Sequence, residues 1–185
     1  MAMGIVLLAI SVGAAGLVMF TARRGKAERE RALSFLEGIF PERSAGFCSY
    51  DAATPALPVI SFEGRDLAGV LSVPKSGASF AIAAEWDRSL ARTFPCRFSG
   101  NAANGSLILG GNGEEEQFGF VKTADIGDTL TFTDLKGKVY TYTVEKVRHL
   151  KSASAAEFEK NDFDLLIFAR PALTGDVILL CCTNH

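Results

Sequence analysis

The sequence predicts a mainly β domain, a small closed or nearly closed barrel of about eight short strands with short helices. The chain has 185 residues, of which 48% are hydrophobic and 22% charged, and this suits one globular domain plus a short additional segment. It contains 18 glycines and 14 phenylalanines, with Val, Ile, Leu and Thr in short runs. Short apolar runs divided by turn residues favour a β-rich body.

An apolar segment opens the chain. Residues 1–22 carry no charged side chain and are long enough to cross a ~30 Å hydrocarbon core as one helix. We therefore expect a single-pass membrane anchor, with a cleaved signal peptide and a buried helix as alternatives. The absence of a charged residue before the apolar run counts against a signal peptide. The cluster Arg23, Arg24 and Lys26 that follows favours a cytoplasmic location for the rest of the chain.

Residues 23–56 are expected to form a juxtamembrane helix and a linker. Leu33, Leu36 and Phe40 have helical spacing, which predicts a helix over residues 26–40. The following segment is rich in Ser, Ala, Gly and Pro, which is typical of a linker or of a loop laid on the domain. The barrel domain is then expected over residues 57–185.

Turn residues divide this domain into short strands. The predicted strands cover residues 67–73, 79–83, 106–109, 128–134, 138–147, 164–170 and 176–181. The glycine-rich residues 110–113 predict a turn, Lys136 and Gly137 predict a hairpin, and residues 152–160 predict a short helix. Trp86 is expected to pack on the barrel.

Composition argues against several classes of function. A net charge of −2 favours neither nucleic acid nor a strongly acidic ligand. The cysteines lack the spacing of a zinc site, and the glycine-rich run lacks the Lys-Ser/Thr of a phosphate loop. Glu114, Glu115 and Glu116 lack the alternating ligand spacing of a calcium loop and are expected as a solvated face. We therefore expect no cofactor and no metal.

Several segments, in order along the chain, resemble a sortase. Sortases are membrane-anchored cysteine transpeptidases that attach surface proteins to the cell wall of Gram-positive bacteria. The segments are residues 57–60, 67–75, 85–87, 95–100, 107–112, 118–119, 126–128, 132–134, 140–144 and the final strand pair. The resemblance implies the eight-stranded sortase barrel, an N-terminal anchor and a soluble domain outside the cell. We give this location more weight than the basic cluster, because so short an N-terminal tail offers little charge contrast.

The three catalytic positions of the family hold other residues in this chain. The resemblance places Gly111 at the catalytic histidine, Arg170 at the nucleophilic cysteine and Asp176 at the arginine that stabilises the oxyanion. Glycine and a permanently protonated guanidinium cannot replace a thiolate or a general acid, and an aspartate repels a developing oxyanion. We expect no standard sortase reaction and no catalytic residue at these positions. We also expect Arg170 and Asp176 to form an ion pair across the turn.

The sequence therefore favours a non-catalytic, sortase-like protein of the cell surface that binds an extended peptide, such as a surface-protein sorting signal, or serves as an accessory protein. The alternative is an active sortase-type cysteine transpeptidase or peptidase with a displaced nucleophile, Cys181 or Cys182, and His149 or His185 as its base. Cys181 is expected in the core and Cys182 at a fraying chain end. A decayed sequence without a present role is a third reading.

Overall fold

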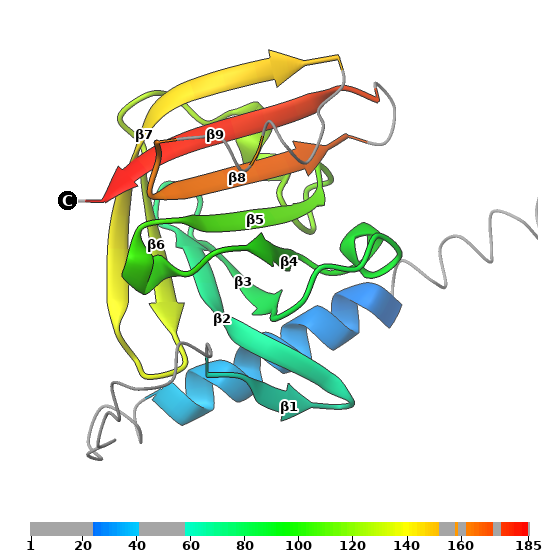
Figure 1. The fold of residues 1–185 in the computed structure, drawn as a ribbon. Helices are drawn as coiled ribbons and strands as arrows, with labels where there is room; N and C mark the ends of the chain where they lie inside the picture. Colours follow the sequence, from blue (N-terminus) through cyan, green and yellow to red (C-terminus); the bar gives the residue numbers. More distant parts are fainter. Residues whose placement is uncertain (1–23, 41–57, 152–157, 159–161, 172–174, 185) are drawn as a thin grey trace, which may run out of the picture.

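The computed structural model describes residues 24–40, 58–151, 158, 162–171 and 175–184 (Figure 1). The expected membrane anchor, the expected linker and most of the expected helix over residues 152–160 lie outside these residues. Within the described part, no helix combines the length and the apolar character that a membrane crossing requires.

Strands dominate the described residues. They are β1 (Ile60–Phe62), β2 (Arg65–Val73), β3 (Ala78–Ala83), β4 (Cys96–Ser99), β5 (Leu107–Asn112), β6 (Thr129–Asp134), β7 (Val139–Leu150), β8 (Leu165–Arg170) and β9 (Val177–Asn184). Their order in the sheet is β1-β2-β3-β4-β5-β8-β9-β7-β6, and β2 also pairs with β6. This second pairing closes β2 to β9 into an eight-stranded barrel, with β1 added outside on β2. The predicted mainly β barrel and its strand number are confirmed.

In the predicted hairpin, now β6 and β7, buried side chains alternate with more exposed ones. Phe132 pairs with Tyr140, and both side chains are buried in the barrel interior. Asp134 fixes the turn, because its Oδ1 accepts hydrogen bonds from the backbone N–H groups of Lys136 at 2.8 Å and Lys138 at 2.9 Å. Sequence alternation and turn chemistry therefore select the same register.

Both faces of β8 and β9 are buried, which explains their continuous apolar runs. Ile167 and Leu180 are paired and point into the barrel interior. Leu166 and Leu179 point to the other face, where they belong to a second apolar cluster that includes Phe158. Because both faces are covered, polar side chains are confined to the ends of these strands.

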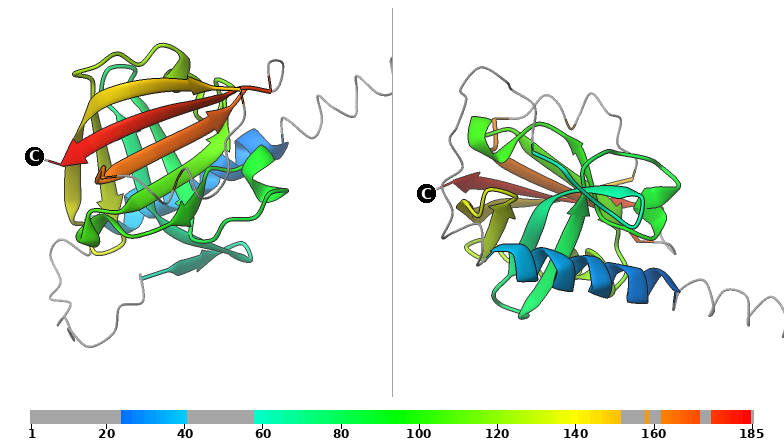
Figure 2. Two further views of the ribbon diagram at one scale, coloured as in Figure 1. Left: turned by 45° about the horizontal axis from the view of Figure 1, so that its top comes forward. Right: turned by 90° about the horizontal axis from the view of Figure 1, so that it is seen from below.

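A helix over residues 24–40 lies against the barrel, and Figure 2 shows it alongside the strands. Leu36 is fully buried in a cluster with Leu67 of β2. Arg65, at the start of β2, forms an ion pair with Glu28 of the helix. The sequence predicted the helix but not this packing, which makes the helix a part of the core of the domain.

The glycine-rich run does not form the predicted turn. β5 continues through Asn112 and pairs in parallel with β8, so that Gly110 lies opposite Phe168. A Cβ atom at Gly110 would lie 2.2 Å from Phe168 Cζ and 2.6 Å from Trp86 Cζ3. The glycine is required by the close approach of these rings and not by a turn, and this is why its sequence signal was misleading.

Candidate functional site

A cleft of about 430 Å3 lies at the carboxyl ends of β5 and β8. The two strands are parallel neighbours, so their last residues meet at the same edge of the barrel. Gly111 near the end of β5 and Arg170 at the end of β8 both line the cleft. The fold therefore brings together two of the three positions that the resemblance assigned to catalysis.

The floor of the cleft is aromatic. Trp86 packs against Phe98 and Phe168, with ring centroids 5.4 Å and 5.2 Å away. Phe158 stacks on Phe168 at 4.3 Å, with the two ring planes inclined by 5°. The expectation that Trp86 packs on the barrel is confirmed, and its ring forms part of the cleft. Such interlocked rings give the cleft a fixed apolar surface.

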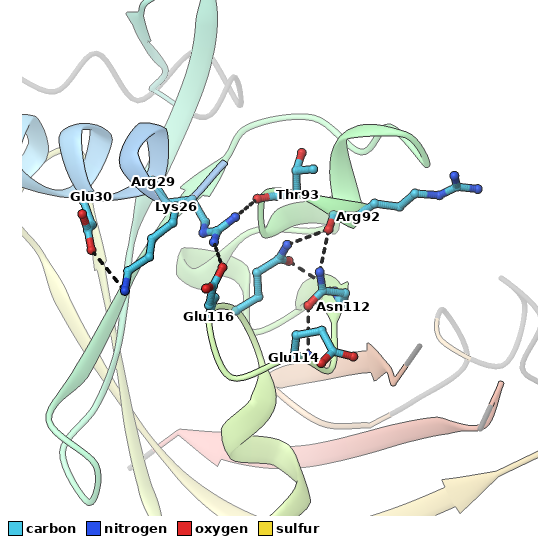
Figure 3. Close-up of polar contacts among 9 residues, drawn as sticks. Lys26, Arg29, Glu30, Arg92, Thr93, Asn112, Glu114 and Glu116 are labelled. Atoms are coloured by element: carbon cyan, nitrogen blue, oxygen red, sulfur yellow. Dashed lines mark hydrogen bonds and ion pairs between the residues drawn. The ribbon is translucent and has the colours of Figure 1, made fainter. Parts of the chain in front are cut away.

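A polar network holds one wall of the cleft (Figure 3). Gln117 is 1% exposed, its Nε2 donates to the Arg92 carbonyl at 3.1 Å, and its Oε1 accepts from the Asn112 N–H at 3.2 Å. Asn112 Nδ2 donates to the same Arg92 carbonyl at 2.6 Å, and Asn112 Oδ1 accepts from the Glu114 N–H at 3.0 Å. These bonds join the end of β5 to the short 3-10 helix η1 (Leu90–Arg92).

The N-terminal helix is tied to the same wall. Arg29 donates to the Thr93 carbonyl and to Glu116 Oε2, the latter at 2.8 Å, as Figure 3 shows. Its side chain is only 13% exposed, and burial lowers the pKa of Arg29, an effect that the Glu116 carboxylate opposes. Glu116 is therefore not simply part of a solvated acidic face, contrary to expectation. Arg29 lies on the same face of the predicted helix as the apolar residues Leu33 and Leu36. A charged residue on this face could have indicated a polar contact with the domain, but the sequence analysis did not use it.

The space beside Gly111 is filled. A Cβ atom there would lie 3.0 Å from Gln117 Oε1 and 3.2 Å from Phe118 Cδ2. Gln117 is held at both ends by hydrogen bonds, and Phe118 is fully buried. The position that the resemblance assigns to a histidine is therefore packed by other side chains and is not an open vacancy.

The predicted ion pair between Arg170 and Asp176 is wrong. Ala169 pairs with Ile178, so strand alternation puts Arg170 on the face of Phe168, whereas Asp176 falls on the alternation of Ile178 and the barrel interior. None of the ion pairs between described residues joins the two, and Asp176 is not among the residues that line the cleft. The two residues flank the same turn, but the alternation of side chains along the strands places them on opposite faces of the sheet.

The described thiols are buried away from the cleft lining. Cys96, Cys181 and Cys182 are 0%, 2% and 0% exposed, and desolvation raises the pKa of each thiol, that of Cys96 to about 11. Cys181 is a core residue, as expected, whereas Cys182 packs in the barrel interior and does not fray. His149 is exposed on β7, and His185 lies outside the described residues. The cleft lining contains no described cysteine or histidine.

Metal ligands are not gathered in the part of the chain that the structure describes, where no group of three or more His, Cys, Asp or Glu residues is placed to hold an ion. What the cleft offers is an aromatic floor, backbone and amide groups on one wall, and guanidinium groups. These groups can make apolar and hydrogen-bond contacts with a ligand, but the described lining contains no nucleophile and base within reach of one another.

Comparisons with known proteins identify the fold. No family model and no curated protein matches the chain. Among solved structures, a Clostridium perfringens sortase D5 transpeptidase is 15% identical with a TM-score of 0.61, the match covering 85% of this chain and 98% of that one.

Two further sortases match at similar strength. A C. perfringens sortase C, solved with the C-terminal cell wall sorting motif, is 12% identical with a TM-score of 0.56, covering 86% of this chain and 90% of that one. Listeria monocytogenes sortase A is 15% identical with a TM-score of 0.54, covering 64% and 87%. Together with the closed eight-stranded barrel, these likenesses show that the chain has the sortase fold.

Proposed function

We propose that this protein is a membrane-anchored, sortase-fold protein that binds an extended peptide in the cleft and does not catalyse transpeptidation. The observation that carries the proposal is the cleft itself, which is formed and aromatic, with Gly111 and Arg170 at its edge and no described thiol in its lining. A ready-made cleft without a nucleophile suits binding without turnover.

The size and surface of the cleft support a peptide ligand. Its volume of about 430 Å3 falls in the range of small-ligand sites, which accommodate a few side chains of an extended segment. The aromatic floor offers apolar contact for one of these side chains, and strand ends at the barrel edge offer backbone groups to a peptide main chain. A sortase C of the same fold was solved with a cell wall sorting motif, which supports a peptide in this protein as well.

The anchor and the location belong to the same proposal. Residues 1–22 carry no charged side chain, and the helix described over residues 24–40 packs on the barrel. An anchor there holds the barrel close to the membrane, on the outer side of the cell by analogy with sortases. Protease treatment of intact cells tests this, because an external domain is digested and a cytoplasmic domain is protected until the cells are lysed.

Peptide binding is tested by fluorescence. Trp86 is the only tryptophan of the chain and lines the cleft, so a bound ligand changes its emission. The full chain in detergent micelles is titrated with a mixture of blocked heptapeptides randomised at every position, and mass spectrometry follows cleavage and transfer. We expect saturable changes in emission without turnover. Phe98→Leu weakens binding because it thins the floor, whereas Phe120→Leu, at an aromatic residue outside the cleft lining, serves as the matched control.

Two outcomes contradict the proposal. Turnover that disappears in Cys181→Ala or Cys182→Ala identifies a displaced nucleophile and makes the protein an enzyme. Absence of any emission change with the peptide mixture, in protein whose thermal unfolding is cooperative, removes peptide binding at this cleft.

A further inference from the structure

Positive charge gathers at the cleft although the chain as a whole carries a net charge of −2. Arg88, Arg92 and Arg170 are exposed and line the cleft beside the aromatic floor. No aspartate or glutamate is among the described residues of the lining. Among the described residues, the lining therefore presents guanidinium groups and no carboxylate to a ligand on the floor, and this part of the cleft is positively charged.

The carboxylate next to these arginines in the chain is already engaged. Asp87 Oδ1 accepts hydrogen bonds from the backbone N–H groups of Ser89 and Leu90 at 2.9 Å and 2.8 Å, and from the Ser89 hydroxyl. These bonds lower the pKa of Asp87 and fix the start of η1. None of the ion pairs between described residues includes Arg88 or Arg92. Their guanidinium groups are therefore available to a ligand.

Hydrogen bonds and strand pairing fix the main chain of Arg92 and Arg170. The Arg92 carbonyl accepts from Asn112 and Gln117, while its side chain extends away from these contacts (Figure 3). Arg170 ends β8 in register with Asn112 of β5. The main chain of Arg92 and that of Arg170 are both held by Asn112 at the end of β5. Little ordering of the main chain is therefore needed when a ligand binds.

We propose that the cleft selects an acidic peptide, with a side-chain carboxylate held by Arg88 and Arg92 and a neighbouring apolar residue packed on the aromatic floor. This inference rests on the proposed function and names its ligand class. Guanidinium groups match the planar geometry of a carboxylate and bind it through paired charge-assisted hydrogen bonds. Phosphate sites usually add backbone N–H groups at a helix N-terminus or a nest, whereas this cleft is floored by aromatic rings.

Matched peptides test the selection. The full chain in detergent micelles is titrated with three blocked heptapeptide mixtures that differ only at the central residue, which is Glu, Gln or Lys, with Trp86 emission as the readout. We expect the Glu mixture to bind about tenfold more tightly than the Gln mixture at low salt, and the Lys mixture to bind most weakly. The preference for Glu shrinks in 0.5 M NaCl because the arginines are exposed.

Substitutions assign the effect to the cleft. Arg88→Gln and Arg92→Gln are each expected to reduce the preference for Glu over Gln about threefold or more, while binding of the Gln mixture changes little. Lys122→Gln removes the same charge from an exposed residue outside the cleft lining and leaves the preference unchanged. Unliganded emission spectra and thermal unfolding confirm that each variant is folded.

The outcomes separate this inference from the proposed function. Equal binding of the Glu and Gln mixtures, or a preference for Glu that survives Arg88→Gln and Arg92→Gln combined, overturns the acidic selection and leaves peptide binding intact. Absence of binding by every mixture overturns both. Displacement of the Glu mixture by inorganic phosphate at equal or lower concentration identifies a phosphate ligand and also overturns the inference.

Discussion

Replacing Gly111 by histidine is expected to destabilise the protein and not to create a catalytic base. The added Cβ atom alone would lie 3.0 Å from Gln117 Oε1 and 3.2 Å from Phe118 Cδ2, before the imidazole ring is placed. Phe118 is fully buried and cannot move aside without disturbing the interior. The ring must therefore displace Gln117, which frees the Asn112 N–H and weakens the support of the Arg92 carbonyl.

The magnitude of the destabilisation follows from the overpacking and from the lost hydrogen bonds of Gln117. Overpacking of a filled site costs about 1–3 kcal/mol, and each lost hydrogen bond of a buried group costs about 1 kcal/mol. We expect Gly111→His to lower the free energy of unfolding by about 3 kcal/mol. For a chain of this size, that corresponds to a decrease in Tm of about 6–12 °C.

Calorimetry or thermal circular dichroism of the full chain in detergent measures the effect. Gly111→Ala is the smaller step and is expected to lower Tm less than Gly111→His. Gln117→Ala opens the space beside Gly111. Adding Gly111→His to the Gln117→Ala variant should therefore lower Tm much less than adding Gly111→His to the native protein. A Tm for Gly111→His equal to that of the native protein would refute the reasoning, because it would show that the site is not filled.

Three further predictions concern the same framework. Arg29→Ala is expected to lower the free energy of unfolding by about 2 kcal/mol, since the largely buried Arg29 side chain loses its charge-assisted hydrogen bonds to the Thr93 carbonyl and to Glu116. The exposed Arg31→Ala is expected to change Tm little, and thermal unfolding compares the two variants. Gly110→Ala should shift the tryptophan emission and lower Tm, because its Cβ atom would overlap two aromatic rings. Since burial raises the pKa of the Cys96 thiol to about 11, the unfolded state loses this proton first, and the free energy of unfolding falls as pH rises from about 9 to 11. Denaturant titrations with Cys96→Ser as control measure the slope, and a native slope equal to that of Cys96→Ser contradicts the assignment.

The fold could be predicted from the sequence where local pattern and tertiary environment agree. The β6–β7 hairpin is the clearest case, since its alternation and its turn residues both specify one register. The strands predicted over residues 164–170 and 176–181 are present as β8 and β9, and their continuous apolar runs match the burial of both faces. The N-terminal helix was found from its periodicity, but the surface that it covers is not encoded in that periodicity.

The site was less predictable because its determinants are contacts between distant segments. Gly110 looked like a turn residue, yet its small size serves the packing of Trp86 on Phe168. Gln117 carries no motif, and its role follows only from burial and two hydrogen bonds to other segments. The expected Arg170–Asp176 pair failed because proximity across a turn says nothing about which face of the sheet each side chain occupies.

The polar groups near Gly111 are hydrogen-bonded or paired. A buried amide costs about 1–3 kcal/mol when its hydrogen bonds are missing, so random drift at a dispensable position leaves unsatisfied groups or cavities. Here Gln117 is almost fully buried, and both ends of its amide are bonded. Arg29 is likewise paired with Glu116 and with the carbonyl of Thr93. These contacts stabilise the wall of the cleft without a described thiol or imidazole, and this supports the proposed binding role.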